Sequence, residues 1–222
     1  QFVSIAASPA VGNYYLKGLI SNFRIVKSAV YTSNFTPPTS PLIAISNTVL
    51  LTCNSYRHRD SSASNLTVSR NSQYDPTTVS RFSPFNGPAA YSPSAMGGSL
   101  YFPNELQGGG NYFYEYPNSL SVTSADVNLS GTNYTVETWF YFTDAAARSW
   151  PSESMPLFNW HNEFSDRWGI IVFFDGQTVE GAGISIFTDG PATSTEFYQT
   201  IARYTWNHLA VTWNGSTTSV YL

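Results

Sequence analysis

Charged residues are scarce in this chain, and lysine is the scarcest of them. Lys and Arg together number 10 and Asp and Glu 14 among 222 residues, a charged share of 11%, against roughly a quarter in an ordinary globular protein. Ser, Thr, Asn and Gly must therefore complete the surface. With Lys17 and Lys27 as the only lysines and a net charge of −4, no basic stripe exists for phosphate contacts, which argues against a nucleic-acid partner.

Cysteine and long apolar runs are also lacking. The single cysteine, Cys53, excludes an intrachain disulfide, so core burial must stabilise the fold. We expect Cys53 to be a buried strand residue. The most apolar stretch, Trp168 to Phe174, is too short to span a bilayer. Because the chain starts at Gln1, with no basic segment leading into an apolar one, we expect an excerpt or a processed chain.

Aromatic residues are abundant, at 15 Tyr, 15 Phe and 6 Trp, and they follow β-type patterns instead of helical spacing. The clearest case lies near the C-terminus, where Leu209, Val211 and Trp213 alternate with smaller or polar residues. Asn214-Gly215 then predicts a tight turn into a second strand. Other strands are predicted at 48–53, 66–69, 99–102, 134–142, 156–160 and 168–174. Many short strands with turn residues between them predict an all-β sandwich or barrel.

The N-terminal part has an organisation of its own. Residues 15–31 are predicted to be extended, with Phe23 and Ile25 on one face and Asn22 and Arg24 on the other. Pro37, Pro38 and Pro41 follow and cannot donate to a sheet ladder, so 35–41 is predicted to be an extended connector. We therefore divide the chain into residues 1–41 and a main domain at 42–222, truncated at its C-terminal end.

Two motifs in the main domain carry a family resemblance. Val136-Glu137-Thr138-Trp139-Phe140-Tyr141, followed later by Trp206-Asn207-His208-Leu209-Ala210-Val211-Thr212, resembles the paired core signature of concanavalin A-like, laminin-G-like domains. Upstream, Gly97 to Phe102 is similar to the strand that precedes this signature in the family. The resemblance spans roughly Thr48 to Leu222. It implies a two-layer antiparallel jelly-roll sandwich.

A second resemblance concerns the N-terminal segment. Gly18 to Ile25, followed by Phe35-Thr36-Pro37-Pro38, resembles the closing segment of such a domain as found in tandem in tailed-bacteriophage virion proteins. Leu50 to Cys53 and Phe82 to Phe85 resemble the opening of the next copy. This interpretation requires residues 18–26 to form a strand inside a sheet, with Phe23 and Ile25 in a core. We expect the strand to complete either the chain's own sandwich or that of a neighbouring copy, with a slight preference for the former.

The resemblance implies a non-catalytic structural or adhesive module of a virion or extracellular surface fibre, presenting loops to a glycan or protein partner and assembling as a homo-oligomer or larger array. Candidate ligand-binding residues are Trp160, Asn162 and Asp166, because a tryptophan flanked by polar groups lies where a strand gives way to a loop. Candidate calcium ligands are Asp175 and Asp189, since calcium takes carboxylate oxygens from loops. The alternative for both aspartates is a plain Asp-Gly turn.

Two rival functions remain open at this point. One is a polysaccharide-degrading glycoside hydrolase on the same fold, which needs two carboxyl groups about 5 to 9.5 Å apart. Glu163 and Asp166 are the nearest approach, but the Glu-x-Asp-x-x-Glu strand of concanavalin A-like glucanases is absent, so we do not expect an enzyme. The other rival is a purely architectural subunit, distinguished by large apolar interfaces between protomers.

Overall fold

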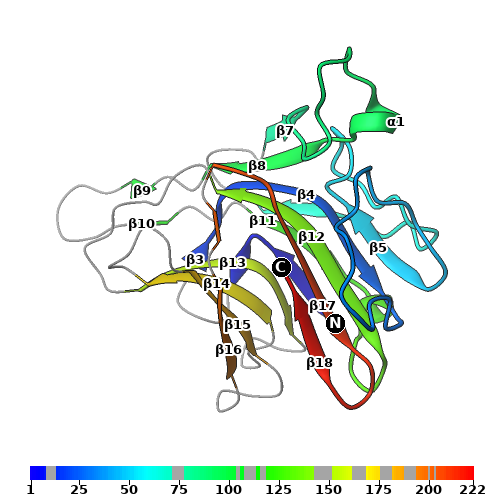
Figure 1. Cartoon of the computed structure of the whole chain (residues 1–222), viewed down its shortest axis with the longest axis vertical. Helices are drawn as coiled ribbons and strands as arrows, with labels where there is room; N and C mark the ends of the chain where they lie inside the picture. The colour runs from blue at the N-terminus through cyan, green and yellow to red at the C-terminus, as the bar shows by residue number, and fades with distance from the viewer. Residues whose placement is uncertain are drawn as a thin grey trace.

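The computed structural model confirms the all-β prediction: the protein is built from two seven-stranded antiparallel sheets with almost no helix (Figure 1). It describes residues 1–8, 14–71, 78–103, 106–107, 114–115, 119–142, 152–161, 169–175, 182–187, 194–199, 201–202 and 204–222. In several of these strands, including 169–175, 182–187 and 194–199, only the backbone is described.

The first sheet combines the N-terminal strand with strands from much later in the sequence. Its strand order is β16 (Ser194–Gln199), β15 (Ala182–Phe187), β14 (Gly169–Asp175), β13 (Ser152–His161), β1 (Phe2–Ile5), β11 (Ser119–Thr123) and β6 (Ser69–Asn71). The N-terminal strand β1 therefore lies in the interior of this sheet, between β13 and β11.

The second sheet has the order β18 (Thr218–Tyr221), β17 (Asn207–Trp213), β12 (Tyr134–Phe142), β4 (Lys17–Val26), β8 (Ser99–Pro103) and β7 (Thr78–Ser80), with β5 (Thr48–Thr52) also paired to β4. Two short pairs, β2 (Ala7–Ser8) with β3 (Tyr14–Tyr15) and β9 (Leu106–Gln107) with β10 (Tyr114–Glu115), complete the described strands. Among the residues that the structure describes, helical structure is limited to α1 (Pro93–Met96) and a 3-10 turn, η1 (Ala125–Val127).

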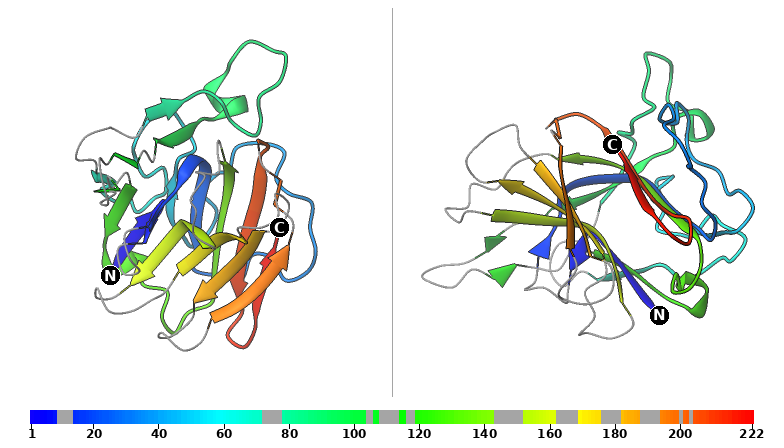
Figure 2. Two further views of the ribbon diagram at one scale, coloured as in Figure 1. Left: turned by 90° about the vertical axis from the view of Figure 1, so that its left-hand side faces the viewer. Right: turned by 60° about the horizontal axis from the view of Figure 1, so that its bottom comes forward.

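The core lies between the two sheets (Figure 2). It takes apolar side chains from both of them: Val3, Ile5, Leu120, Val122, Leu157 and Phe158 from the first, and Ile20, Phe23, Ile25, Val136, Phe140, Leu209 and Val211 from the second. The rings of Phe23 and Phe158 meet across the layers with centroids 5.4 Å apart. This contact between opposite sheets defines a two-layer sandwich.

The prediction for the N-terminal strand is confirmed. β4 lies inside the second sheet, bonded to β12, β8 and β5 of its own chain, and Phe23 and Ile25 are fully buried in the core. Each of the two large sheets thus contains a strand from residues 1–41 and strands from residues 42–222. Opposite Thr138, β4 carries one extra residue where the register shifts, and Asn22 takes a positive φ of 54° there, as a β-bulge permits for asparagine.

Several other strands match their predictions. β5, β8, β12 and β14 begin and end within a residue or so of the expected bounds, and the hairpin of β17 and β18 turns at Asn214-Gly215. Cys53 is fully buried and comes directly after β5. The strand expected at 66–69 lies instead at β6, residues 69–71. No helix of the described residues is long and apolar enough to cross a membrane.

Candidate functional site

The face of the second sheet that points away from the core, called here the outer face, holds the most distinctive side chains. Along β12, Val136, Phe140 and Phe142 belong to the core. Glu137, Trp139 and Tyr141 alternate with them and contact other residues on the outer face instead. This period-2 pattern places one charged and two aromatic side chains in a row.

Glu137 is the centre of a buried charge cluster. Its carboxylate is 1% exposed and accepts bonds from Arg24 at Oε1, from Nε at 2.8 Å and from Nη2 at 2.5 Å. The Tyr31 hydroxyl donates to Oε2 at 2.8 Å, and His208 Nε2 lies 3.4 Å from the same oxygen. Four polar contacts therefore compensate the loss of water around one buried carboxylate.

The pKa of Glu137 reflects this competition. Burial alone acts to raise the pKa, but the nearby His208 imidazole, the charge of Arg24 and the hydrogen bond from Tyr31 outweigh it and hold the pKa below 4.5, its ordinary value. Burial, followed by the neighbouring Glu137 charge, raises the pKa of the Tyr31 phenol. Glu137 is thus ionised at neutral pH, which does not suit a general acid.

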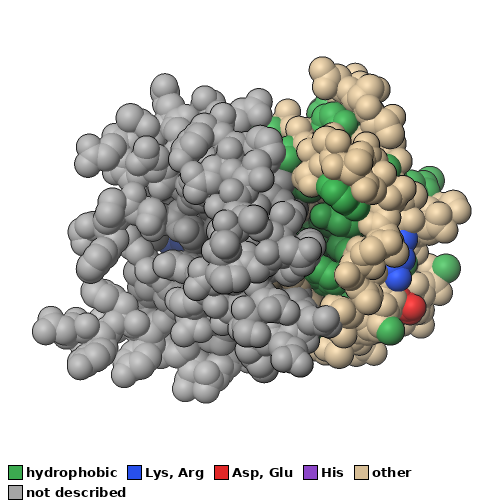
Figure 3. Space-filling view, turned by 90° about the horizontal axis from the view of Figure 1, so that it is seen from below, with side chains coloured by type: hydrophobic (Ala, Val, Ile, Leu, Met, Phe, Trp, Pro, Cys, Tyr) green, Lys and Arg blue, Asp and Glu red, His purple; other side chains and the backbone are tan. Residues whose placement is uncertain are grey.

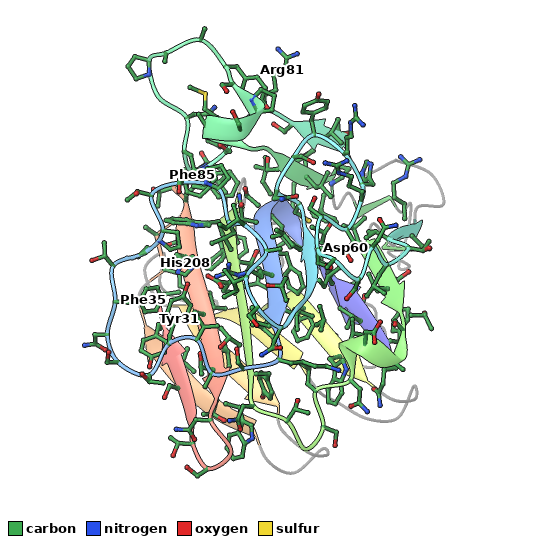
Figure 4. The ribbon with its side chains drawn as sticks, turned by 90° about the vertical axis from the view of Figure 1, so that its right-hand side faces the viewer. Tyr31, Phe35, Asp60, Arg81, Phe85 and His208 are labelled. Carbon is green, nitrogen blue, oxygen red and sulfur yellow. The ribbon has the colours of Figure 1, made fainter. Side chains whose placement is uncertain are left out.

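The segment between β4 and β5, residues 27–47 and called here the connector, covers part of the outer face. Tyr31 stacks on Phe35 with centroids 3.7 Å apart, and Phe35 contacts His208 edge-on at 5.8 Å. Arg24 Nη1 also donates to the backbone oxygen of Ile43 at 2.7 Å. Figure 4 shows Tyr31, Phe35 and His208 grouped in front of the sheet. The charge cluster therefore fixes the connector to the sandwich on both sides of the predicted proline-rich segment 35–41.

Next to the connector lies a group of five aromatic side chains, called here the aromatic band: Phe82, Phe85, Trp139, Tyr141 and Trp206. Three rings contact one another, with centroids 5.1 Å apart for Phe82–Tyr141, 5.4 Å for Phe82–Trp206 and 5.5 Å for Tyr141–Trp206. Phe85 meets Trp139 edge-on at 5.8 Å. β12, the residue before β17 and the loop after β7 supply these rings. Trp139 and Tyr141 lie two residues apart on the same face of β12, which places the pair beside the trio.

The exposure of the aromatic band distinguishes it from the core. Phe82 is 41% exposed, and the other four rings are half-buried. The indole Nε1 atoms of Trp139 and Trp206 are buried and have no hydrogen-bond partner among the described residues. Buried donors of this kind normally find an acceptor. The band therefore combines accessible ring faces with two donors whose bonding capacity is unused.

Of the three residues predicted to bind a ligand, the structure describes only Trp160, which is not part of the aromatic band. Trp160 lies in β13, opposite Val3, is 4% exposed and belongs to the core cluster, so little of its ring is available at the surface. Asn162, Asp166 and the weaker candidate Glu163 lie outside the described residues.

The structure also describes the two predicted calcium ligands only in part. Asp175 is the last residue of β14, with its backbone opposite Ser152, and its side chain is not described. Asp189 lies outside the described residues. In the part of the chain that the structure describes, three or more His, Cys, Asp or Glu side chains gather nowhere in a way that could hold a metal ion. Calcium at Asp175 and Asp189 stays a prediction.

Two further buried groups have structural roles. The Asp60 carboxylate accepts bonds from the backbone N–H groups of Leu51, Ser62 and Leu66 at 3.0, 2.8 and 2.9 Å, which fixes the loop after β5. Burial raises the pKa of the Cys53 thiol to about 12, so it is not a thiolate at neutral pH.

The fold and site together define a two-layer β-sandwich that carries an aromatic band on one outer face. No family model, curated protein or solved structure matches the chain. Sequence reasoning did not single out the band or the charge cluster. The available signal was the presence of Arg24 and Glu137 inside apolar strand patterns of a chain with few charges, because a charge inside a strand needs a partner when buried.

Proposed function

We propose that this protein is a non-catalytic adhesive module of a virion or extracellular surface fibre that binds carbohydrate through the aromatic band. The observation that carries the proposal is the mutual contact of Phe82, Tyr141 and Trp206 at a partly exposed position. Sugar rings present C–H groups on their faces and pack well on aromatic rings. An apolar surface with a few hydrogen-bonding groups is the usual composition of a small-ligand site.

The buried charges beside the band are paired with each other. Glu137 and Arg24, on the outer face of β12 and β4, form an ion pair and are buried, so neither offers a free charge to a glycan. Recognition would rest on stacking of the sugar against the rings, with little contribution from the Arg24–Glu137 pair. In the part of the view from below that is described, few side chains belong to Lys, Arg, Asp or Glu (Figure 3).

The resemblance to concanavalin A-like, laminin-G-like domains supports the same function from the sequence side. Trp139, Tyr141 and Trp206, three members of the band, belong to the two motifs that carry this resemblance. A jelly-roll arrangement of the two sheets is part of the proposal. Because this kind of sandwich hosts binding and catalysis alike, the argument depends on the site and not on the fold.

A glycan array probed with the labelled protein tests the proposal. We expect Phe82→Ala and Trp206→Ala to weaken retention by about fivefold or more, since an aromatic contact contributes roughly 1 kcal/mol. Tyr56→Ala is the matched control, because Tyr56 is also 41% exposed but does not contact the band. Far-ultraviolet circular dichroism confirms that each variant is folded. No retention of the wild-type protein would contradict the proposal, as would equal retention of all variants.

A further inference from the structure

Two loops of the second sheet carry a set of arginine and tyrosine side chains, called here the arginine surface. The loop after β5 and the segment between β7 and β8 supply its members, which are Tyr56, Arg57, Arg59, Arg81 and Tyr91. All of them are exposed except Tyr91, which is half-buried. Figure 4 shows Arg81 well apart from Tyr31 and Phe35 of the connector. Three of the 10 Lys and Arg residues of the chain belong to this surface, so it holds much of the positive charge of a weakly charged protein.

Backbone contacts hold the two loops together. A Cβ built at Gly98 would lie 2.8 Å from the carbonyl carbon of Ser55 and 3.1 Å from the backbone oxygen of Ser80, so both loops approach the same glycine. The Asp60 carboxylate fixes the first loop by accepting bonds from its backbone N–H groups. The arginines therefore extend from a fixed backbone, which reduces the conformational entropy lost when a ligand binds.

Tyrosine rings orient two of the three guanidinium groups. Arg57 Cζ lies 5.7 Å from the centroid of the Tyr56 ring. Arg81 Cζ lies 5.1 Å from that of the Tyr91 ring, and both distances are in the cation–π range. The Tyr91 hydroxyl donates to the backbone oxygen of Gly97, which fixes that ring. Burial raises the pKa of the Tyr91 phenol, while the Arg81 charge acts to lower it and the Tyr56 phenol to raise it. The two stacked pairs are therefore within electrostatic range of each other.

The charges of the arginine surface are not neutralised by any described carboxylate. Among the described residues, no ion pair involves Arg57, Arg59 or Arg81. Asp60 follows Arg59 in the sequence, but its carboxylate is buried and accepts backbone hydrogen bonds. A guanidinium group presents its N–H donors as a planar fork that matches two oxygens of one anion, even while its face stacks on a ring. The surface is therefore suited to a carboxylate or a sulfate.

We propose that the arginine surface binds the carboxylate or sulfate groups of an acidic polysaccharide, as a recognition site separate from the aromatic band. The exposed Tyr56 ring beside Arg57 adds an apolar face on which a sugar ring can pack. A nucleic acid fits less well, because a protein with a net charge of −4 and three clustered cations releases few counterions from a phosphate backbone. The proposal goes beyond the stacking of carbohydrate on the aromatic band and does not depend on it.

Biolayer interferometry at physiological salt, about 150 mM, tests this site with two matched pairs of polymers. Dextran sulfate is compared with dextran, and polygalacturonate is compared with its methyl ester, so that the members of a pair differ chiefly in their anionic groups. We expect the acidic member of at least one pair to bind about tenfold or more tightly than its uncharged counterpart. The pair that shows the difference identifies sulfate or carboxylate as the group recognised.

Two double variants connect this difference to the arginines. Arg57→Gln with Arg81→Gln should weaken binding of the acidic polymer about tenfold or more, because charge-assisted hydrogen bonds are lost. Arg57→Lys with Arg81→Lys keeps both charges but not the planar fork, and it should weaken binding about threefold. Both side chains are exposed, so the fold should tolerate the changes, and far-ultraviolet circular dichroism verifies this.

Lys27→Gln is the matched control for net charge. Ser21 donates its hydroxyl to the Gly98 oxygen, and Lys27 lies six residues beyond it in extended chain, about 20 Å from the two loops. Loss of this lysine should have little effect. Trp206→Ala should also leave the preference for the acidic polymer unchanged, whereas Tyr56→Ala should still bind uncharged sugars like the wild type. Failure of this site and failure of the aromatic band are thus distinguishable.

Three results would overturn the proposal. They are the absence of a preference in both polymer pairs, unchanged binding by the Arg→Gln double variant, and an equal loss of binding in Lys27→Gln. Binding of single-stranded oligothymidylate as tight as that of the acidic polymer would also overturn it, because the surface would then belong to a nucleic-acid site.

Discussion

At the scale of single residues, the contacts of Glu137 determine how the connector lies on the sandwich. Its carboxylate binds Arg24 of β4 and Tyr31 of the connector, and it lies beside His208 of β17. A buried ion pair adds little compared with well-packed apolar residues, but removal of one partner leaves the other charge buried and uncompensated. The cluster therefore favours one arrangement of β4, β17 and the connector around β12.

Glu137→Gln should destabilise the fold by about 3 kcal/mol or more, because it leaves the Arg24 guanidinium buried without a counter-charge. Urea unfolding followed by tryptophan fluorescence measures the loss. The double variant Arg24→Met with Glu137→Leu is the control, and we expect it to regain much of the stability, since it removes both charges together. A double variant as unstable as the single one would show that the charge itself is not the cause.

The free energy of unfolding should also depend on pH through the Glu137 carboxylate. The folded-state pKa of Glu137 lies below the ordinary value of 4.5, so the ionised form stabilises the fold above that pH. This contribution is lost as the pH falls from about 4.5 through the folded-state pKa. Urea unfolding between pH 3 and pH 7 should therefore show a steeper decline below about pH 4.5 in the wild type than in Glu137→Gln. Parallel curves for the two proteins would be inconsistent with this assignment.

At the scale of elements, β4 is the most tightly enclosed strand of the second sheet. Gly18 lies opposite Phe142, and a Cβ built at this glycine would meet the backbone oxygen of Tyr141 at 2.2 Å. The neighbour is backbone, so it cannot turn aside as a side chain would. The close approach of β4 and β12 thus requires glycine at this position.

Gly18→Ala should destabilise the fold by about 1 to 3 kcal/mol, the usual range for overpacking a tightly packed interior site. Gly87→Ala provides the control, because nothing lies within 4 Å of a Cβ at that position, and its effect should be small. Thermal unfolding of the two variants checks the difference. Similar melting temperatures for both would mean that β4 and β12 can separate enough to accept a methyl group.

Local pattern predicted some elements well and others poorly. β12 and the β17–β18 hairpin were predictable because apolar residues alternate within them and Asn214-Gly215 marks the turn. β1 and β11 were missed: each is short, and each owes its place to pairing with strands far away in the sequence. The full burial of Ala210, on the face opposite Val211, also could not be predicted. Such burial depends on what covers the outer face, and a strand pattern does not contain that information.

At the scale of the whole molecule, the first 26 residues contribute an interior strand to each sheet. β1 lies between β13 and β11, and β4 lies between β12 and β8. A protein lacking residues 1–26 would expose unpaired edges in both sheets and lose Val3, Ile5, Phe23 and Ile25 from the core. The resemblance of this segment to the end of a preceding repeat does not make it dispensable.

We expect residues 27–222 alone to lack a cooperative thermal transition. Each large buried side chain that is lost removes several kcal/mol of stability, and the sum over the lost side chains exceeds the usual free energy of unfolding of a domain. Differential scanning calorimetry measures this. Addition of a synthetic peptide of residues 1–26 during refolding should restore part of the transition, which separates loss of the strands from damage to the remaining chain. A cooperative transition in the truncated protein without the peptide would contradict the shared-core arrangement.

The central claim concerns the aromatic band, and sequence reasoning reached only part of it. Trp139 and Trp206 lie in the motifs that suggested the fold, yet Trp160 was chosen as the ligand-binding tryptophan because it precedes a polar stretch. Burial of Trp160 depends on β1 packing beside β13, a pairing that no local pattern predicts. Contacts between rings from β12, the residue before β17 and the loop after β7 are likewise a property of the assembled sheet.

The most direct test uses the six tryptophans as reporters in a ¹⁵N–¹H correlation spectrum. Each indole N–H gives one resonance, which is assigned by single Trp→Phe substitutions. The protein is then titrated with the oligosaccharide that retains it best on the glycan array. We predict that the resonances of Trp139 and Trp206 shift in a saturable manner while that of Trp160, buried in the core, stays in place. Saturable shifts confined to other tryptophans, or no shift at all, would contradict carbohydrate binding at the aromatic band.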